Sequence, residues 1–461
     1  MANRAPIIST VPVDGAALRR LATHAPDDFP VFFDSAAQGP LARYSLLAAR
    51  PVASLTRDAE GGLDAEGLTL VPGGFLDNLR AWAAQGTPGT RVADLPFAGG
   101  WFVYLGYELA AEIEPRLQLP AVDAPFSAFA LRVNTFVLHD LATGSVRVIT
   151  DNGDVDVHEA VIARLVEAGN FPAPTDRRPL PLASLREEAP ERFLAQVRAA
   201  KEHIAAGDIY QANLSRGWRL QLAHAADAPS VYEALCAANP APFAARVTWR
   251  GFSILSSSPE RLLRIAGRHI STRPIAGTRP RLPPSEGGRV DQDRRDLDEL
   301  VQHPKERAEH IMLIDLERND LGRVCEAGSV TVDEYMVTES YAHVHHIVSN
   351  VSGRLRADAT AVDALRALFP GGTITGCPKV RCMQVIAELE GQGRGAYTGA
   401  FGWLNRDGDL DLNILIRTLA IERDMIRLRA GAGIVADSIA ERELDETRAK
   451  AKGLLRALGV E

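Results

Sequence analysis

Residues 208–222 read DIYQANLSRGWRLQL, and this run decides the fold expected for the chain. Apolar and polar side chains alternate along it as they do in a partly buried β-strand. The preceding residues Phe193, Val197 and Ala200 keep helical spacing until Gly207, a residue type that often ends helices. Helical and strand-like runs interleave along the rest of the chain as well. The sequence therefore predicts an α+β protein with large sheets covered by helices.

A proline-rich segment marks the expected division of the chain. Residues 171–190, FPAPTDRRPLPLASLREEAP, carry five prolines and no long apolar period, which is typical of a linker. The segment separates an N-terminal α/β subdomain, residues 1–170, from a catalytic domain, residues 191–461. A chain of 461 residues is long enough for one large or two ordinary domains.

The composition excludes several classes of protein. Hydrophobic residues make up 46% and charged residues 24% of the chain, which excludes disorder. No apolar stretch approaches the roughly 20 residues of a membrane span, and the N-terminus lacks a signal-length apolar core. A net charge of -8 argues against nucleic-acid binding. We expect a cytoplasmic protein without membrane or nucleic-acid partners, whose four cysteines, none in a CxxC pair, are reduced.

A glycine-containing run with three arginines is the first candidate binding loop. Residues 272–281 read TRPIAGTRPR, in which Gly277 permits close approach of the backbone to a ligand. The cations that surround it are Arg273, Arg279 and Arg281. Because arginine binds carboxylates through two parallel hydrogen bonds, we expect this loop to bind an anion.

Two expected helices carry acidic side chains three positions apart. The C-terminal helix, predicted to open with a capping box of Ser438 and Glu441, presents Glu443 and Glu446. The helix expected after Pro304 presents another such pair, Glu306 and Glu309. Two carboxylate pairs from different helices suit Mg²⁺. Acidic pairs of this spacing are more often solvated helix faces, which spacing alone favours here.

Two small-residue runs complete the candidate sites. Residues 429–433, RAGAG, follow a strand-like run and are suited either to aim backbone N–H groups at a carboxylate or to form a tight turn. Residues 369–383, FPGGTITGCPKVRCM, superficially resemble a phosphate loop. Since no GxxxxGK[ST] pattern follows, nucleotide binding is disfavoured.

Taken together, the ordered motifs after the linker resemble the chorismate-utilising family, which includes anthranilate, aminodeoxychorismate, isochorismate and salicylate synthases. The resemblance covers essentially everything after the linker. It rests on GDIYQANL (207–214), SSPERL (257–262), TRPIAGTRPR (272–281), KERAEHIMLIDLERNDLGR (305–323), VHHIVS (344–349), FPGGTITGCPK (369–379), GAYTGAFGW (395–403), LNILIRT (412–418), GAGIVADS (431–438) and ELDETRAK (443–450). It implies the chorismate-binding fold, in which large antiparallel sheets pack face to face and are covered by helices.

The resemblance also implies three sets of site residues. The catalytic positions are Glu260, Ala276, Gln211 and His346. The substrate-binding positions are Gly277, Thr278, Thr375, Gly376, Tyr397, Arg417, Gly431, Ala432, Gly433 and Lys450. The Mg²⁺ ligands are chiefly Glu309 and Glu446, with Glu306 and Glu443 in support. For the two acidic pairs, the resemblance thus favours Mg²⁺ binding over solvated helix faces.

Several of these positions have an expected chemical role. Glu260 matches the general acid that protonates the departing ring hydroxyl. Arg417 and Lys450 match groups that hold the substrate carboxylates, the first by a two-pronged contact and the second as a point charge. His346 matches a histidine near the leaving group, whereas structural roles are expected for His343 and His345.

Gln211 separates the branches of the family. The resemblance implies that family members that add water to the ring carry a lysine at this position. This lysine acts as a general base, which the reaction needs because water is a poor nucleophile. A glutamine cannot remove that proton, whereas ammonia needs no base. Gln211 therefore favours the amine-adding branch. The chain shows no glutaminase motif, so a separate glutaminase subunit is the implied source of ammonia.

Sequence features divide between carbon 2 and carbon 4 as the ring carbon that receives nitrogen. Aminodeoxychorismate synthases carry a lysine at the position of Ala276, which attacks carbon 2 before ammonia adds at carbon 4. Ala276 instead favours direct attack at carbon 2, the anthranilate route of tryptophan biosynthesis. FPGGTITGCPK and NPAPF (239–243) resemble aminodeoxychorismate synthases more closely, and FFDS (32–35) departs from the LLES motif of tryptophan-inhibited enzymes.

On balance the segments favour aminodeoxychorismate synthesis, which supplies para-aminobenzoate for folate biosynthesis. The alternative within the family is anthranilate synthesis. A catalytically inactive paralogue with a regulatory or binding role is a third interpretation, disfavoured by the intact set of Glu260, Glu309, Glu446 and Lys450.

Overall fold

The computed structural model describes residues 5–37, 43–85, 95–173, 180–281, 303–340 and 344–460, together with positions 295, 297 and 299. His343, for which a structural role is expected, lies outside the described residues, as do residues 174–179 of the expected linker. Only the backbone of Thr278 is described.

The described strands form two large antiparallel sheets, one of 12 and one of 11 strands. The first sheet has the order β1 (Ile7–Val11), β9 (Ser145–Thr150), β8 (Thr135–Asp140), β3 (Tyr44–Ala48), β2 (Val31–Asp34), β12 (Phe243–Trp249), β13 (Phe252–Ser258), β22 (Thr418–Glu422), β23 (Met425–Ile434), β11 (Gln211–Leu222) and β10 (Leu182–Glu187), with β19 (Gly376–Cys377) paired to β11. The second sheet has the order β16 (Ile275–Pro280), β18 (Val344–Arg354), β15 (His269–Thr272), β14 (Arg261–Ala266), β21 (Leu410–Ile414), β20 (Ala400–Asn405), β6 (Gly100–Leu105), β7 (Phe126–Val133), β4 (Ala53–Asp58) and β5 (Leu63–Glu66), with β17 (Thr331–Ser340) paired to β18.

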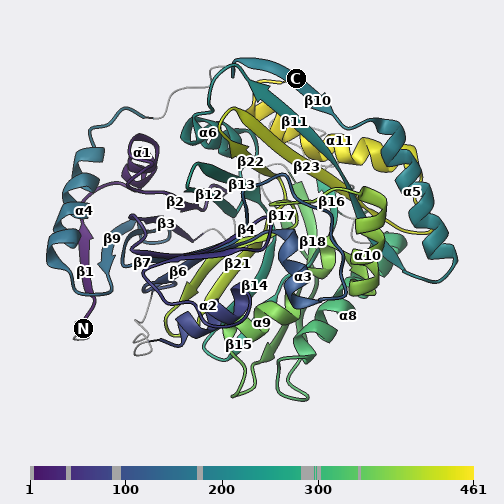
Figure 1. The fold of residues 1–461 in the computed structure, drawn as a ribbon, viewed down its shortest axis with the longest axis horizontal. Helices are drawn as coiled ribbons and strands as arrows, with labels where there is room; N and C mark the ends of the chain where they lie inside the picture. The colour runs from purple at the N-terminus through teal and green to yellow at the C-terminus, as the bar shows by residue number, and fades with distance from the viewer. Residues whose placement is uncertain are drawn as a thin grey trace.

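Helices cover the outer faces of both sheets (Figure 1). They are α1 (Ala16–His24), α2 (Phe75–Ala83), α3 (Ala110–Ile113), α4 (Val155–Ala168), α5 (Pro190–Ala205), α6 (Ala228–Ala238), α8 (Pro304–Gly322), α9 (Ala361–Leu368), α10 (Lys379–Glu390) and α11 (Ala440–Ala457), with 3₁₀ turns η1 (Tyr107–Leu109) and η2 (Gly372–Ile374). In Figure 1, α2 and α9 lie along the lower side of the molecule and α11 along the upper side.

The three largest hydrophobic clusters of the described residues lie between these layers. One lies between the first sheet and α1, α4, α6 and α11, and another between the second sheet and α2, α8 and α9. The third joins the inner faces of the sheets, where the rings of Phe33 on β2 and Phe401 on β20 stack with centroids 4.8 Å apart. Aromatic side chains bury much apolar area, so this contact helps to hold the sheets together. The predicted α+β fold with face-to-face antiparallel sheets is confirmed.

Strand β11 organises the first sheet, as the alternating run predicts. It pairs with β23 along ten residue pairs and also with β10 and β19. Its side chains Leu214, Trp218 and Leu220, which pack with the covering helices, are at most 2% exposed. The helix expected before it is α5, which ends near Gly207, a residue in the left-handed region at φ 80°.

The expected linker is partly structured. Its residues Leu182–Glu187 form the edge strand β10, which pairs with β11. Strands from before and after residues 171–190 contribute to both sheets, so this segment does not separate one sheet from the other. The division into an N-terminal subdomain and a catalytic domain stays a prediction.

The predicted capping box at the C-terminal helix is wrong. Helix α11 begins at Ala440 with Ile439 as its N-cap and no side-chain cap. The Ser438 hydroxyl instead accepts the Val435 N–H at 3.1 Å, while Lys201 donates to the Ser438 carbonyl at 2.7 Å. The turn before the helix thus uses the hydroxyl that the capping box requires.

Two expectations from composition can be compared with the described residues. None of their helices is long and apolar enough to cross a membrane. The four cysteines are free thiols, three of them buried. This agrees with small buried side chains rather than disulfide or zinc chemistry.

Candidate active site

Glu260 lies in the short connection between β13 and β14 and is only 5% exposed. Its Oε1 accepts the N–H of Ile275 at 3.4 Å. Burial raises the pKa of Glu260 to about 7, and the charge of Glu317 raises it further. The Thr373 side chain and the N–H of Ile275 act in the opposite direction and lower this pKa. The positive charge of Lys450 lowers the same pKa. A carboxyl group with this pKa retains protons near neutral pH and is suited to general acid catalysis.

Tyr397, Gly431 and Lys450 meet at the end of strand β23. A Cβ atom on Gly431 would lie 2.6 Å from the Tyr397 hydroxyl oxygen, so only glycine permits this approach. Lys450 on α11 donates to the Gly431 carbonyl at 2.9 Å and forms an ion pair of 2.7 Å with Glu446. Because Lys450 also acts electrostatically on Glu260, the structure brings these predicted residues into one region.

Gln211 lies at the start of β11, against the small residues of two neighbouring strands. It pairs with Cys377 of β19, next to Gly376, whose φ of 135° is accessible to glycine. A Cβ atom on Gly433 would lie 2.5 Å from the Gln211 side-chain nitrogen. Gln211 is 6% exposed, and its Oε1 has no hydrogen-bond partner among the described residues. A buried carbonyl oxygen of this kind favours a bound donor, since an unpaired polar atom is costly to bury.

The hydroxyl of Thr375 has a structural use. The residue is fully buried, and its hydroxyl donates to the carbonyl of Gly371 at 2.9 Å. Its own carbonyl accepts the Asn213 N–H at 2.8 Å. Thr375 therefore joins the glycine-rich turn to β11, and its hydroxyl proton is committed to that turn rather than to a ligand.

The centre of the TRPIAGTRPR run forms strand β16, which pairs with β18. Ala276 is opposite Ile347 and Thr278 is opposite His346, and the register shifts at Gly277, where φ is 61°. This irregularity is a β-bulge, which commonly redirects a side chain near a site. Ala276 is 8% exposed and contributes only a methyl group. Neither the bulge nor Ala276 supplies a nucleophile.

His346 and Arg417 lie within electrostatic reach of each other. Burial lowers the pKa of His346 to about 4, and the Arg417 charge lowers it further. His346 is therefore neutral near pH 7. Arg417 has a left-handed backbone at φ 51°, donates to the Asn239 side chain at 3.4 Å and forms no ion pair with a described acidic residue. Burial lowers the pKa of Arg417. A half-buried guanidinium without a carboxylate partner is suited to bind an anion.

Two of the three arginines of TRPIAGTRPR are paired with carboxylates and are not available for the expected anion site. Arg273 pairs with Glu334 and Glu339, both at 2.6 Å. Arg279 pairs with Glu306 at 2.7 Å. These carboxylates neutralise the two arginines, so the predicted anion-binding role is wrong for them. Arg417 is the better candidate.

The four carboxylates expected to bind Mg²⁺ lie on α8 and α11. Among the described residues, no group of three or more His, Cys, Asp or Glu side chains converges to hold a metal ion. Glu306 keeps one buried carboxylate oxygen, Oε2, without a hydrogen-bond partner. Mg²⁺ prefers oxygen ligands and usually keeps waters or substrate oxygens beside one or two carboxylates. The residues present therefore fit a partly open Mg²⁺ site, although the described contacts do not assemble all four.

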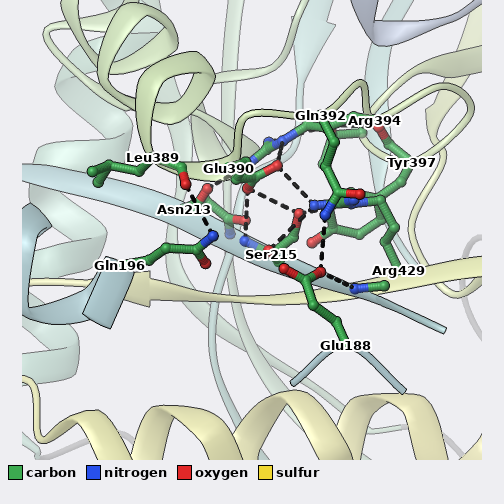
Figure 2. A network of polar contacts seen from close by, with 12 residues as sticks. Glu188, Gln196, Asn213, Ser215, Leu389, Glu390, Gln392, Arg394, Tyr397 and Arg429 are labelled. Carbon is green, nitrogen blue, oxygen red and sulfur yellow. Dashed lines mark hydrogen bonds and ion pairs between the residues drawn. The ribbon is translucent and has the colours of Figure 1, made fainter. Parts of the chain in front are cut away.

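A buried ionic network supports the strands of the site and was missed from the sequence. Figure 2 shows Glu390 at its centre, 1% exposed, accepting the N–H and hydroxyl of Ser215 at 2.8 and 2.9 Å. Arg394 and Arg429 pair with the same carboxylate at 2.5 and 2.9 Å. The Arg394 guanidinium also lies 5.7 Å from the centroid of the Tyr397 ring. The network thus links α10, β11 and β23 to the loop that carries Tyr397.

We expect Glu390→Gln to lower the free energy of unfolding by about 3 kcal/mol, because it leaves two buried arginines without their carboxylate. Burial alone would raise the pKa of Glu390, but Arg394 and Arg429 hold it below its ordinary value. Its stabilisation is therefore complete above the pKa of an unfolded glutamate and is lost as pH falls through the lower folded value. Urea unfolding at neutral and acidic pH measures both effects.

Glu388→Gln is the matched control, since Glu388 lies on the same helix and is exposed. It should change stability by less than about 0.5 kcal/mol. Equal unfolding free energies for Glu390→Gln and wild type would contradict the assigned role of the network.

Two buried carboxyl groups on α8 were also not predicted from the sequence. Glu317 is 3% exposed and influences Glu260, and Asp320 pairs with Lys379. A signal was available: Glu317 follows Glu306 by 11 positions, about three helical turns, and so lies on a similar face of the helix. Spacing alone did not show that this face is buried.

Comparisons with known proteins agree with the fold. The chain matches the family described as chorismate binding enzyme over residues 36–456. It is 43% identical over 374 residues to an anthranilate synthase component I-like protein of Synechocystis, covering 79% of this chain and 73% of the relative. It is 40% identical over 374 residues to aminodeoxychorismate synthase component 1 of Bacillus subtilis, covering 78% and 77%.

A solved structure, anthranilate synthase component I of Streptococcus pneumoniae, superposes with a TM-score of 0.79 at 33% identity, covering 90% of this chain and 92% of that one. The family match spans most of the chain, including much of the sequence before the expected linker. The chain belongs to the chorismate-binding enzyme family and is a chorismate-utilising enzyme. Its relatives include proteins named anthranilate synthase and aminodeoxychorismate synthase.

Proposed function

We propose that the protein aminates chorismate with ammonia to form 4-amino-4-deoxychorismate, the precursor of para-aminobenzoate. The choice of ammonia depends on Gln211, which is buried at the site and cannot act as the base that water requires. Its unpaired carbonyl oxygen offers an acceptor for a hydrogen of ammonia. A separate glutaminase subunit is the proposed source of ammonia. The Bacillus subtilis relative is named aminodeoxychorismate synthase component 1, which agrees with the proposed product.

The proposed reaction exchanges the carbon 4 hydroxyl for an amino group. Arg417 and Lys450 hold the substrate carboxylates, and protonated Glu260 gives its proton to the departing hydroxyl, which leaves as water. Ammonia forms the new carbon–nitrogen bond, and the proton that the new ammonium group loses restores Glu260. Glu309 and Glu446, with Glu306 and Glu443 in support, would hold Mg²⁺, which would supply positive charge to neutralise a substrate carboxylate.

The choice of carbon 4 depends on the paired glycines of FPGGTITGCPK. A Cβ atom on Gly371 would lie 3.0 Å from Ile414 Cδ1, and one on Gly372 would lie 2.6 Å from Leu316 Cδ2. The packing thus favours the GG form of this turn, which resembles aminodeoxychorismate synthases. Ala276 favours the second candidate, anthranilate synthesis, because it offers no covalent nucleophile. On the proposed route ammonia reaches carbon 4 without a lysine intermediate.

One incubation tests the product. We expect purified protein with chorismate, Mg²⁺ and ammonium to form 4-amino-4-deoxychorismate, identified by mass spectrometry, without releasing pyruvate. Omitting ammonium or adding EDTA should stop product formation. Fluorescent anthranilate and pyruvate without added lyase would establish the second candidate instead. No consumption of chorismate would indicate an inactive paralogue.

A further inference from the structure

A second buried carboxyl group, that of Glu317, lies beside the proposed proton donor Glu260. Glu317 is 3% exposed, and its Oε1 accepts the N–H of Gly372 at 3.2 Å. The side chain of Thr272 also hydrogen bonds to it. None of the roles assigned above uses this acid.

Two short segments of chain connect Glu317 to Glu260. Gly372, which donates its N–H to Glu317, precedes Thr373, whose side chain acts on the pKa of Glu260. Thr272, the other partner of Glu317, lies three residues before Ile275, whose N–H donates to Glu260 at 3.4 Å. A movement of Glu317 would therefore displace the two segments that lie against the Glu260 carboxyl group.

The packing leaves this turn little freedom. A Cβ atom on Gly372 would lie 2.9 Å from the Oε1 of Glu317 and 2.6 Å from the Cδ2 of Leu316. Contacts this close are shorter than real Cβ atoms adopt, so a larger residue at position 372 would require the Leu316 and Glu317 side chains to shift. The Glu317 side chain therefore packs directly against the turn to which it is hydrogen bonded.

Charge also couples the two acids. Asp320, one turn further along α8, pairs with Lys379, which also donates to the Leu368 carbonyl at 3.1 Å. Thus the three carboxyl groups of Glu260, Glu317 and Asp320 are buried, whereas the ammonium groups that act on them, those of Lys379 and Lys450, are 11% and 43% exposed. Several uncompensated negative charges are costly in such surroundings, so protons are retained.

The pKa values agree with this arrangement. Burial, and then Asp320, raise the pKa of Glu317 to about 7, the same value as for Glu260. Interacting acids of this kind titrate as a pair. His310 on α8 and His346 on β18 have pKa values lowered by burial to about 4 and carry no charge near neutral pH.

We propose that Glu317 is a positioning residue for Glu260, which orients the proton donor through the Gly372–Thr373 turn and interacts with it as a second carboxyl group. This inference rests on the proposed function, in which Glu260 donates the proton. It extends that function to a residue whose contacts are made by α8, η2 and the segment before β16.

Two substitutions separate the charge of Glu317 from its geometry. Glu317→Gln keeps an acceptor for Gly372 but removes the charge, so Glu260 should lose its proton at lower pH. We expect the high-pH decline of kcat/KM for chorismate to move about one pH unit lower, giving about tenfold less activity at pH ~8 and nearly unchanged activity at pH ~6. Glu317→Asp keeps the charge but shortens the side chain. It should lower kcat about tenfold without moving the decline.

The matched control is Asp315→Asn on the same helix, where the side chain is 64% exposed; it should leave both the rate and the pH profile unchanged. A Glu317→Gln profile that superposes on wild type would overturn the charge coupling, even if the melting temperature falls. An unchanged kcat for Glu317→Asp would overturn the positioning role and is measurable even if the Gln variant fails to fold. If the wild-type protein makes anthranilate, the proposed product is contradicted but the role of Glu317 is not. The anthranilate route also expels the carbon 4 hydroxyl and so also needs the proton of Glu260.

Discussion

Replacing Glu260 with Gln is expected to lower kcat for chorismate consumption by about 10²–10⁴-fold, the usual contribution of a general acid. The amide has nearly the same shape but no acidic proton for the departing hydroxyl. In the wild-type protein, the pKa of about 7 that burial produces keeps part of Glu260 protonated at neutral pH. Activity that requires this proton should decline as pH rises through that value. Turnover with saturating ammonium and Mg²⁺ across a pH series measures both effects.

Glu326→Gln provides a control for the loss of a carboxylate as such. Glu326 is 41% exposed and pairs with Arg268 at 2.6 Å on the surface, so its replacement should leave the rate near that of wild type. A Glu260→Gln variant that keeps a rate within tenfold of wild type, with the same decline at high pH, would remove Glu260 from the role of proton donor.

Glu309→Gln and Glu446→Gln should each lower the Mg²⁺-dependent rate by about 10³-fold or more. A Lewis acid contributes several kcal/mol of charge stabilisation, and each 1.36 kcal/mol corresponds to a factor of ten. Calorimetric titration with Mg²⁺ gives a second measurement that does not depend on turnover. Both variants should bind the ion more weakly than wild type, because each lacks one charged oxygen ligand.

Glu441→Gln is the control on helix α11. Glu441 is 65% exposed and lies 3.7 Å from Arg198, so neither Mg²⁺ affinity nor rate should change. The Mg²⁺ titration is needed because Glu446 also forms an ion pair with Lys450. Loss of that ion pair would by itself alter substrate binding and lower the rate. Normal Mg²⁺ affinity in Glu446→Gln would show that Glu446 serves Lys450 rather than the metal.

Local sequence patterns predicted the elements that depend on neighbouring residues. The alternation in 208–222 corresponds to β11, and Pro304 begins α8 as its first-turn position allows. The small residues Gly376, Gly431 and Gly433 occur where strands and side chains approach closely. These features follow from chain stereochemistry, which a short stretch of sequence already contains.

Patterns that depend on distant partners were less informative. The arginine-rich run predicted an anion site, but Arg273 is neutralised by Glu339, 66 positions along the chain. The capping box failed because Ser438 bonds to the preceding turn and to Lys201. In both cases a polar side chain had several partners within reach, and packing selected among them.

The sequence by itself determined the order of the motifs, the family they define and the presence of Gln211 rather than a base at the start of β11. Only the tertiary structure decided which charges remain available and which acids hold protons. Glu390 and Glu317 look alike in the sequence, yet two arginines lower the pKa of the first while burial beside Asp320 raises that of the second. The physical reason is that desolvation and charge depend on groups within a few ångströms, and folding brings those groups together from segments far apart in the chain.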